Sequence, residues 1–346
     1  MADGGEPQGT DGAVVVTGLS EAEAVAFQAR FDQAVGQVGR VVLGQREVVR
    51  SVLVALIAGG HVLLEGPPGI GKTLLARSMA QVLGVQFTRI QFTPDLMPSD
   101  VTGGNVFNQR VDDFVFRPGP VFTQVLLADE INRAPAKTQA ALLEAMGDRQ
   151  VTVDGETRPL PRPFFTLATQ NPVESEGTYP LPEAQLDRFL IKVLVGHPSK
   201  AVEVRLLEHY VSGFDASELD AVGLEQVLDE GAIAELQRQA RRVTVEAEIL
   251  DYIASVVGRT RAHPAVDLGA SPRASIALLL ASQVLAAAEG RTFVVPDDVK
   301  ELAMPVLRHR FLLQPDAELE GTRPDDVVRA ILLDVPVPGG ERSAPA

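Results

Sequence analysis

Hydrophobic positions follow two different patterns in the two parts of this 346-residue chain. Up to about residue 198, short apolar runs alternate with segments whose apolar residues recur at helical spacing. The runs HVLLEG, VQFTRIQF, VLLADE, FFTLATQ and LIKVLV predict strands, and TLLARSMAQVL and KTQAALLEAMG predict helices between them. Strands that alternate with helices favour an α/β fold with a largely parallel sheet.

Two helices are predicted ahead of the first strand. The segment SEAEAVAFQARFDQAV opens with a capping-box pattern, Ser20 and Glu23, and carries Phe27 and Phe31 at helical spacing. A second helix is predicted through REVVRSVLVALIAG. Both belong to the first part of the chain.

Beyond HPSK the pattern changes. From about 199 to 335 it is helical, with almost no convincing strand. The chain is therefore predicted to hold an α/β domain at 20–198 and an all-α domain at 199–337. The ends, 1–19 and 338–346, have the composition of flexible tails.

Composition narrows the setting of the protein. The chain has no cysteine, which excludes disulfides and thiolate metal sites and fits a reducing compartment. Its acidic, Gly-rich start does not resemble a secretory signal, and its apolar runs are too short or too interrupted to span a bilayer. We therefore expect a cytoplasmic protein with no membrane span.

The formal net charge of −15 argues against a broadly phosphate-binding surface. We therefore expect no nucleic-acid partner, although a local basic groove stays compatible with this charge.

The motif GPPGIGKT fits the P-loop pattern at every fixed position. The predicted strand before it and the predicted helix after it are the required context and argue against an ordinary turn. Its backbone N–H groups would surround phosphate oxygens, Lys72 would bridge the β- and γ-phosphates of ATP, and the Thr73 hydroxyl would bind Mg²⁺. The predicted phosphate-binding set is Gly66, Pro67, Pro68, Gly69, Ile70, Gly71, Lys72, Thr73 and Leu74.

Polar residues end two of the predicted strands. In VLLADE, Asp129 would hold Mg²⁺ and Glu130 would polarise the attacking water, although two acids here can also be a solvated strand end. The neighbouring Glu130 separates a hydrolase from a nucleotide kinase. In FFTLATQNP, Gln170 and Asn171 would lie at the crevice where α/β sheets bind nucleotides. The alternative for these two amides is a turn started by Asn-Pro.

Two arginines lie at predicted helix ends. In LPEAQLDRF, a short helix is predicted to open at Leu181 and Pro182 and to close at Arg188, where a cation suits the helix dipole. In GASPRA, Ser271 is the predicted N-cap, and Arg273 in the first turn opposes the dipole. Such a broken local rule can mark a functional site, whereas the alternative is a solvated surface arginine.

Taken together, GPPGIGKT, LLADEINRAPAKTQAALLEAM, ATQNP, LPEAQLDRF and GASPRA resemble the MoxR family of AAA+ ATPases, over roughly residues 20 to 335. The resemblance implies a P-loop NTPase core with a helical lid. It implies that 66–73 are Walker A, that Asp129 and Glu130 are Walker B, and that Asn171 is sensor 1.

The same resemblance assigns the two arginines. Arg273, in the lid, is similar to sensor 2, and Arg188 resembles an arginine finger that reaches the γ-phosphate held by a neighbouring subunit. The implied assembly is a homo-oligomer, usually a hexameric ring. VVLGQ resembles the segment that lines the adenine pocket, which adds Gly44 and Gln45 to the candidate nucleotide-binding residues.

Two hairpins are predicted to interrupt the α/β core, near 103–118 and 150–161. NVFN can pair with DFVF in the first, and an Asp-Gly turn marks the tip of the second. In related proteins both face the pore or the substrate surface, but from sequence alone ordinary loop ornaments are the simpler interpretation. The aromatic residues Phe107, Phe114 and Phe116 indicate either partner contact or a small satellite core.

We therefore expect an ATP- and Mg²⁺-dependent ATPase that remodels or matures a protein partner in a chaperone-like role. The resemblance suggests a client with a von Willebrand A domain and the insertion of a metal or cofactor. A magnesium-chelatase-type ATPase subunit is the main alternative. A DNA motor is disfavoured by the acidic charge, and a scaffold that hydrolyses little ATP is disfavoured by the intact Glu130.

Overall fold

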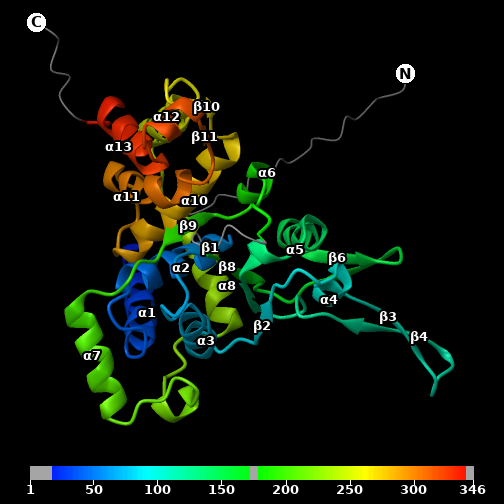
Figure 1. Ribbon diagram of the computed structural model, residues 1–346. Helices are drawn as coiled ribbons and strands as arrows, with labels where there is room; N and C mark the ends of the chain where they lie inside the picture. Colours follow the sequence, from blue (N-terminus) through cyan, green and yellow to red (C-terminus); the bar gives the residue numbers. More distant parts are fainter. Residues whose placement is uncertain (1–17, 172–177, 340–346) are drawn as a thin grey trace, which may run out of the picture.

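The computed structural model describes residues 18–171 and 178–339 (Figure 1). The predicted tails at 1–19 and 338–346 thus fall almost wholly outside the described residues. A five-stranded parallel sheet forms the centre, in the order β2-β5-β8-β1-β9. Its strands are β1 (Val62–Glu65), β2 (Phe87–Gln91), β5 (Val125–Asp129), β8 (Phe165–Gln170) and β9 (Ile191–Leu194). The predicted α/β fold with a parallel sheet is confirmed.

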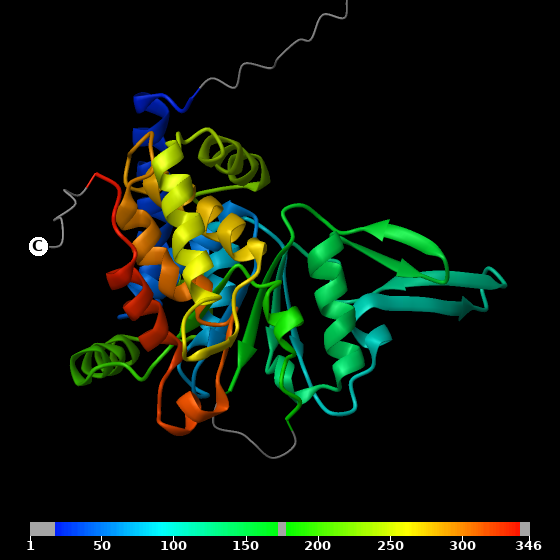
Figure 2. The ribbon, with the colours of Figure 1, turned by 90° about the horizontal axis from the view of Figure 1, so that it is seen from above.

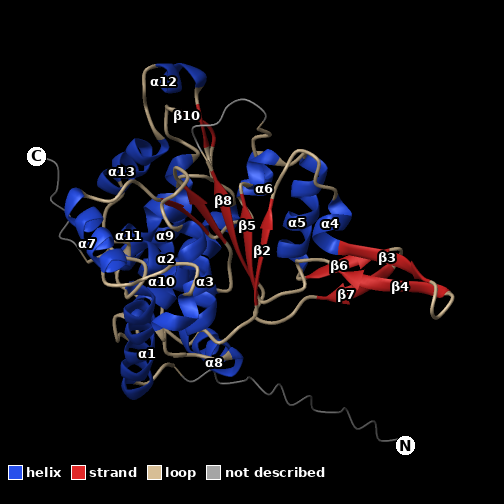
Figure 3. Cartoon of the chain, turned by 60° about the horizontal axis from the view of Figure 1, so that its bottom comes forward, coloured by secondary structure: helices blue, strands red, loops and turns tan. Residues whose placement is uncertain are grey.

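Helices cover both faces of this sheet (Figure 3). Alternate residues of a strand point to opposite faces, so Leu63 packs with α5 (Ala136–Asp148), whereas Val62 and Leu64 join a larger core. That larger core contains residues of α1 (Glu21–Gly39), α2 (Arg46–Ala58) and α3 (Lys72–Val82). The predicted capping box of α1 is confirmed, since Glu23 N–H donates to Ser20 Oγ and Ser20 N–H donates back to the Glu23 carboxylate.

The C-terminal part of the chain is mainly helical. Its longer helices are α7 (Lys200–Val211), α8 (Glu230–Ala240), α9 (Ala247–Thr260), α10 (Pro272–Ala288), α11 (Pro296–Leu307) and α13 (Pro324–Asp334), with the short α12 (Pro315–Leu319) and the 3-10 turn η2 (Leu219–Val222). The sequence did not predict the short antiparallel pair β10 (Val266–Leu268) and β11 (Leu312–Leu313). Helix α10 packs on both α1 and α2, so one hydrophobic cluster continues across position 198, and the proposed domain boundary there stays a prediction.

Two hairpins project from the α5 side of the sheet (Figures 1 and 2). One consists of β3 (Gly103–Asn108) and β4 (Asp113–Pro118), which pair NVFN with DFVF as predicted, and the other of β6 (Gln150–Val153) and β7 (Glu156–Pro159). The short helices near them are α4 (Pro98–Thr102), η1 (Ile131–Arg133) and α6 (Glu183–Leu186).

The hairpin aromatics differ in exposure, and contact with a partner stays a prediction. Phe107 and Phe114 are 48% and 66% exposed and contact each other across the strands, whereas Phe116 packs edge-on against Phe122 and lies under the Arg158 guanidinium. No helix within the described ranges is both long enough and apolar enough to cross a membrane.

Candidate nucleotide site and arginine edge

The P-loop, 66–73, joins β1 to α3, as the sequence predicts. Gly69 and Gly71 take φ angles of 81° and 85°, which side chains adopt at a cost, so glycine suits both positions. A Cβ on Gly66 would lie 2.2 Å from the Val195 carbonyl oxygen, so this glycine permits a close backbone approach. The turn therefore requires glycine at each of these three places.

Lys72 is the first residue of α3 and points back across the P-loop. Its Nζ donates to the Gly66 carbonyl oxygen at 2.8 Å. Burial lowers the pKa of Lys72, and the nearby carboxylates of Asp129, Glu130 and Glu65 oppose this shift. The ammonium is thus held inside the loop, where phosphate oxygens would lie.

A cavity of about 770 Å³ adjoins the P-loop, within the size range of small-molecule sites. Its walls are the P-loop, the segment 41–45 and helix α7. Gln45 Nε2 donates to the Ile70 carbonyl oxygen at 2.9 Å, and a Cβ on Gly44 would lie 2.6 Å from Val202 of α7. Segment 41–45 is thus packed between the P-loop and α7, and this cavity can hold the base of a nucleotide whose phosphates lie in the P-loop.

Asp129 ends β5 and is buried. Its Oδ1 accepts a hydrogen bond from the Thr169 hydroxyl at 2.6 Å, and its Oδ2 accepts two from the Arg89 guanidinium, at 2.6 and 3.1 Å. Sequence reasoning missed both partners. Arg89 reaches Asp129 because β2 pairs directly with β5, an order of strands that the sequence does not specify.

Glu130 has a left-handed backbone, with φ 55° and ψ 51°, which is an uncommon conformation for a side-chain-bearing residue. Its backbone N–H donates to Thr169 Oγ1 at 2.8 Å. Its carboxylate accepts from Gln91 Nε2 at 2.7 Å and forms an ion pair with Arg133 at 3.0 Å. In this structure, therefore, both carboxylates are held by neighbouring side chains of the same chain.

Asn171 follows β8 directly and is buried. Strand β8 lies between β5 and β1, and the Gly66 N–H donates to the Gln170 carbonyl oxygen at 3.2 Å. The end of β8 thus lies beside the start of the P-loop. Asn171 is therefore on the same edge of the sheet as the P-loop and the two carboxylates.

Arg188 lies two residues beyond α6. The predicted helix limits were wrong: Pro182 is the N-cap with an extended ψ of 151°, and the helix ends at Leu186 before the Asp187 cap. Arg188 Nη1 donates to the Leu143 carbonyl oxygen of α5 at 2.7 Å, and a Cβ on Gly147 would lie 2.1 Å from this nitrogen. The guanidinium therefore packs against the backbone of α5.

Arg273 lies in the first turn of α10 as predicted, with Ser271 as N-cap and Pro272 at the first position. Arg273 and Arg188 line one small cavity of about 180 Å³, together with Gly60. Gly60 precedes β1, whereas the P-loop follows it, so this cavity lies at the opposite edge of the sheet. Neither arginine lines the nucleotide-sized cavity of its own chain.

Arg310 lines the same small cavity with a side chain that is only 2% exposed. It donates to Asp187 Oδ1 at 2.9 Å and to the carbonyl oxygens of Phe189 and Leu190 at 2.6 and 2.9 Å. The Ser271 hydroxyl donates to the other Asp187 oxygen at 2.9 Å. Burial lowers the pKa of Arg310 to about 10, so it stays charged at neutral pH.

The residues on both sides of Arg188 are therefore fixed to the C-terminal helices. Sequence reasoning missed Asp187 and Arg310, because nothing in the local pattern links positions so far apart in the chain. We call the set Asp187, Arg188, Ser271, Arg273 and Arg310 the arginine edge.

Comparison with known proteins places this geometry in a family. Residues 61–191 match the model described as ATPase family associated with various cellular activities (AAA), and residues 258–331 match the AAA lid domain. Chaperone MoxR1 of Mycobacterium tuberculosis is 43% identical over 317 residues, which cover 89% of this chain and 82% of that protein. The chain belongs to the MoxR family of AAA+ ATPases.

Two further similarities extend along almost the whole MoxR-family chain. YeaC of Bacillus subtilis is 48% identical over 306 residues, covering 88% of this chain and 94% of YeaC. The solved structure of a candidate ATPase from Cytophaga hutchinsonii has a TM-score of 0.84 and 38% identity, covering 92% of this chain and 97% of that one. The protein is thus an ATPase with an α/β nucleotide-binding core and a helical lid.

Proposed function

We propose that this MoxR-type ATPase hydrolyses ATP at the junction of two copies of the chain and uses the cycle to remodel a protein partner. One observation carries the proposal: the P-loop and the arginine edge lie at opposite edges of the same sheet. In a head-to-tail assembly, the arginine edge of one copy would meet the P-loop of the next.

The first role of the site is to bind and orient ATP. The P-loop amides and Lys72 would hold the phosphates. Gln45, which lines the cavity, would border the base, and Gly44 would let segment 41–45 pack closely against Val202. Thr73 and Asp129 would hold Mg²⁺, and they fit it, since this ion usually combines one or two carboxylates with substrate phosphates. When bound, Mg²⁺ would neutralise charge on the β- and γ-phosphates.

The second role is to activate water. Glu130 would accept a hydrogen bond from the attacking water and act as its general base. Asn171 would orient the water or a γ-phosphate oxygen. To do so, the Glu130 carboxylate must exchange its contacts with Gln91 and Arg133. The held carboxylate thus corresponds to a resting arrangement.

The third role belongs to the neighbouring copy. Arg188 and Arg273 would both approach the γ-phosphate of the next copy, because they line one cavity. Asp187, next to Arg188, also accepts a hydrogen bond from Ser271, which lies two residues before Arg273. A cation near the γ-phosphate stabilises the charge that spreads over the transferred phosphoryl group. The assembly that we expect is a hexameric ring, as is usual in the family.

The client role rests on the family. The name of chaperone MoxR1 supports a chaperone-like role, and we expect this role in the cytoplasm. We propose a protein client, with a von Willebrand A domain as the first candidate and insertion of a metal or cofactor as its outcome. No specific observation favours the magnesium-chelatase or DNA-motor alternatives.

A mixing experiment tests the shared site. Arg188→Ala keeps a sound P-loop and Glu130 but lacks the finger, whereas Glu130→Gln keeps the finger but lacks the activating carboxylate. Each variant alone should hydrolyse ATP poorly, and phosphate release should rise on mixing after subunit exchange. Near-normal turnover by an assembled Arg188→Ala protein would contradict the proposal.

A further inference from the structure

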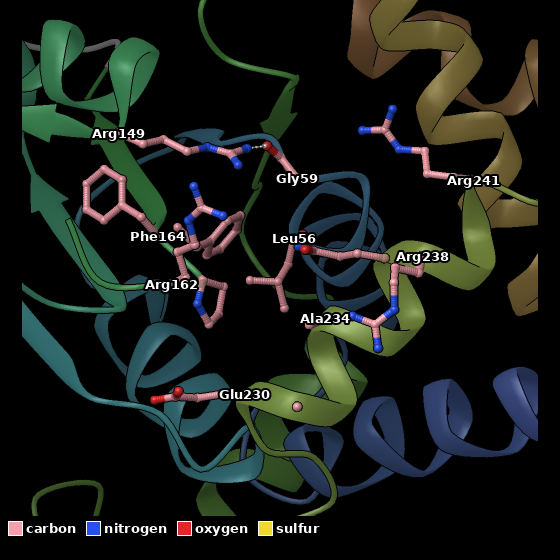
Figure 4. Close-up of a pocket in the computed structure, with 13 residues that line it drawn as sticks. Leu56, Gly59, Arg149, Arg162, Phe164, Glu230, Ala234, Arg238 and Arg241 are labelled. Atoms are coloured by element: carbon pink, nitrogen blue, oxygen red, sulfur yellow. Dashed lines mark hydrogen bonds between the residues drawn. The ribbon is translucent and has the colours of Figure 1, made fainter. Parts of the chain in front are cut away.

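A second cavity, of about 580 Å³, lies near the amino ends of β1 and β8, where Gly59 and Phe165 line it (Figure 4). The P-loop, in contrast, follows the carboxyl end of β1. Four segments form the walls of the second cavity: the end of α2, the end of α5, the loop before β8, and helix α8. It shares no lining residue with the nucleotide-sized cavity. Any ligand here would thus be separate from the bound nucleotide.

Four arginines line this cavity; Arg238 of α8 forms an ion pair with Glu235, and the other three come from different segments. Arg149 caps α5, Arg162 lies in the loop before β8, and Arg241 caps α8. Within residues 18–171 and 178–339, no carboxylate forms an ion pair with any of the three. This is unexpected in a chain with 46 acidic and 31 basic residues.

Two of the guanidinium groups are held in place by backbone oxygens. Arg149 donates to the Gly59 carbonyl at 2.9 Å, as Figure 4 shows, and Arg241 donates to the Ala58 carbonyl at 3.5 Å. A guanidinium group carries five N–H donors. Each of these two arginines uses one nitrogen to cap the end of α2. The remaining donors are therefore oriented but without a carboxylate.

Placing these cations close together, with no anion between them, is electrostatically unfavourable. Partial desolvation and the neighbouring Arg149 both lower the pKa of Arg241. Arg149 also has a left-handed backbone with φ 54°, a conformation that arginine adopts at a cost. An anion between the arginines would relieve the charge repulsion.

We propose that this cavity binds a small anion with two or more oxyanion groups, phosphoryl or carboxylate. Guanidinium groups pair with both in a bidentate manner, and the volume lies in the small-molecule range. Leu56 and Phe164 supply an apolar wall, while the Glu230 carboxylate lies on a different side of the cavity from Arg149 and Arg241 (Figure 4). The anionic groups would therefore lie near the arginines, away from Glu230.

Calorimetric titration tests the proposal, with inorganic diphosphate and citrate as separate probes. The protein carries Lys72→Ala to suppress binding in the P-loop, and wild-type protein saturated with ADP serves as a second background. We expect saturable binding of one probe per chain that weakens as salt increases. The relative affinity of the two probes distinguishes a phosphoryl ligand from a carboxylate one.

Removing a positive charge and removing a negative charge should change the binding affinity in opposite directions, which makes the test specific. Arg162→Gln should weaken binding roughly tenfold, as for one lost charge-assisted hydrogen bond, and should leave the fold intact because its side chain has no hydrogen bond in the described structure. Arg241→Gln should act alike. Glu230→Gln should strengthen binding, because it removes a negative charge from the cavity. Arg110→Gln, at the turn of the first hairpin, is the matched control.

Two outcomes would overturn the proposal. One is the absence of saturable binding of either probe in both backgrounds. The other is equal affinity of Arg162→Gln, Arg241→Gln and Arg110→Gln, which would assign the binding to some other surface. If the arginine substitutions instead disrupt oligomer assembly while neither probe binds, the cavity is a contact between copies of the chain.

Discussion

At the carboxyl ends of the strands, the residues proposed to bind phosphate come from one continuous loop, and the two carboxylates lie at the end of β5, which β8 separates from β1. At the amino ends, Arg188 and Arg273 come from segments far apart in the chain, and the buried Arg310 fixes the backbone beside Arg188. The nucleotide site therefore depends on local backbone geometry. The arginine edge depends on packing between the α/β core and the C-terminal helices.

This difference predicts which substitutions should impair each half of the site. A substitution in the P-loop would act directly on the phosphates that we propose it binds. A substitution at Ser271, before α10, or at Arg310, after α11, would act on Arg188 through Asp187. It would reduce hydrolysis in the next copy without changing nucleotide affinity in its own. The four predictions below separate the two halves.

The largest expected effect is at the arginine edge. Arg188→Ala should lower ATP turnover in the assembled protein by roughly 10³–10⁵, as arginine fingers do in GTPases, because it removes the proposed finger cation. Nucleotide affinity should stay close to that of wild type. Turnover and affinity are measured on the same assembled sample, and a parallel loss of both would place Arg188 in the binding site instead.

The next effect divides the nucleotide site itself. Glu130→Gln should lower hydrolysis by about 10²–10⁴ and keep ATP binding, because it removes the base and retains the shape. Lys72→Ala should abolish tight ATP binding, because Lys72 is the cation inside the P-loop. Fluorescent-nucleotide titration and phosphate release measure the two. Equal hydrolysis by Glu130→Gln and wild type would exclude Glu130 from the chemical step.

A smaller effect tests the link between the two halves. Ser271→Ala and Ser20→Ala each remove a helix N-cap and should each cost about 1 kcal/mol of stability. Only Ser271 also binds Asp187, so only Ser271→Ala should slow turnover, by roughly tenfold as for one lost charge-assisted hydrogen bond. Denaturant melts and steady-state kinetics give both quantities. Equal turnover of the two variants would disprove the link.

The smallest effect is a pH dependence that arises at the amino ends of the strands. Burial lowers the pKa of His61 to about 4 and that of His309 well below its usual value, so both are neutral in the folded state. The unfolded chain takes up protons near pH 6.5, so stability is full above that pH and falls as the pH decreases. Between pH 7 and 5.5, each histidine should cost about 1 kcal/mol.

Urea unfolding at several pH values measures this loss. His61→Gln should show a weaker dependence on pH than wild type. A slope unchanged by this substitution would assign the acid sensitivity to other groups.

Much of this could be predicted from sequence, for physical reasons that differ by region. Strand and helix order follow from hydrophobic period, and the hairpin register follows from the NVFN and DFVF pairing. The P-loop is identified by residues that are contiguous in the chain. The limits of α6 were wrong because Pro182 is as compatible with an N-cap as with a first turn.

The remaining parts depend on tertiary contacts that no local pattern encodes. The hydrogen bonds of Arg89 to Asp129, of Gln91 to Glu130 and of Arg310 to Asp187 each connect distant segments. The joint location of Arg188 and Arg273 follows from how α10 packs against the core. The short strands β10 and β11 are too brief to give an alternating pattern.

The contact between Arg188 and the Leu143 carbonyl has a consequence for timing in the cell. In a lone copy the guanidinium already has a partner within its own chain, and the proposed nucleotide site lacks the arginine of a neighbouring copy. On the proposed mechanism, ATP use per copy would therefore increase with local protein concentration. Dilution would therefore lower ATP hydrolysis, and a newly synthesised copy would hydrolyse little ATP until it assembled with other copies.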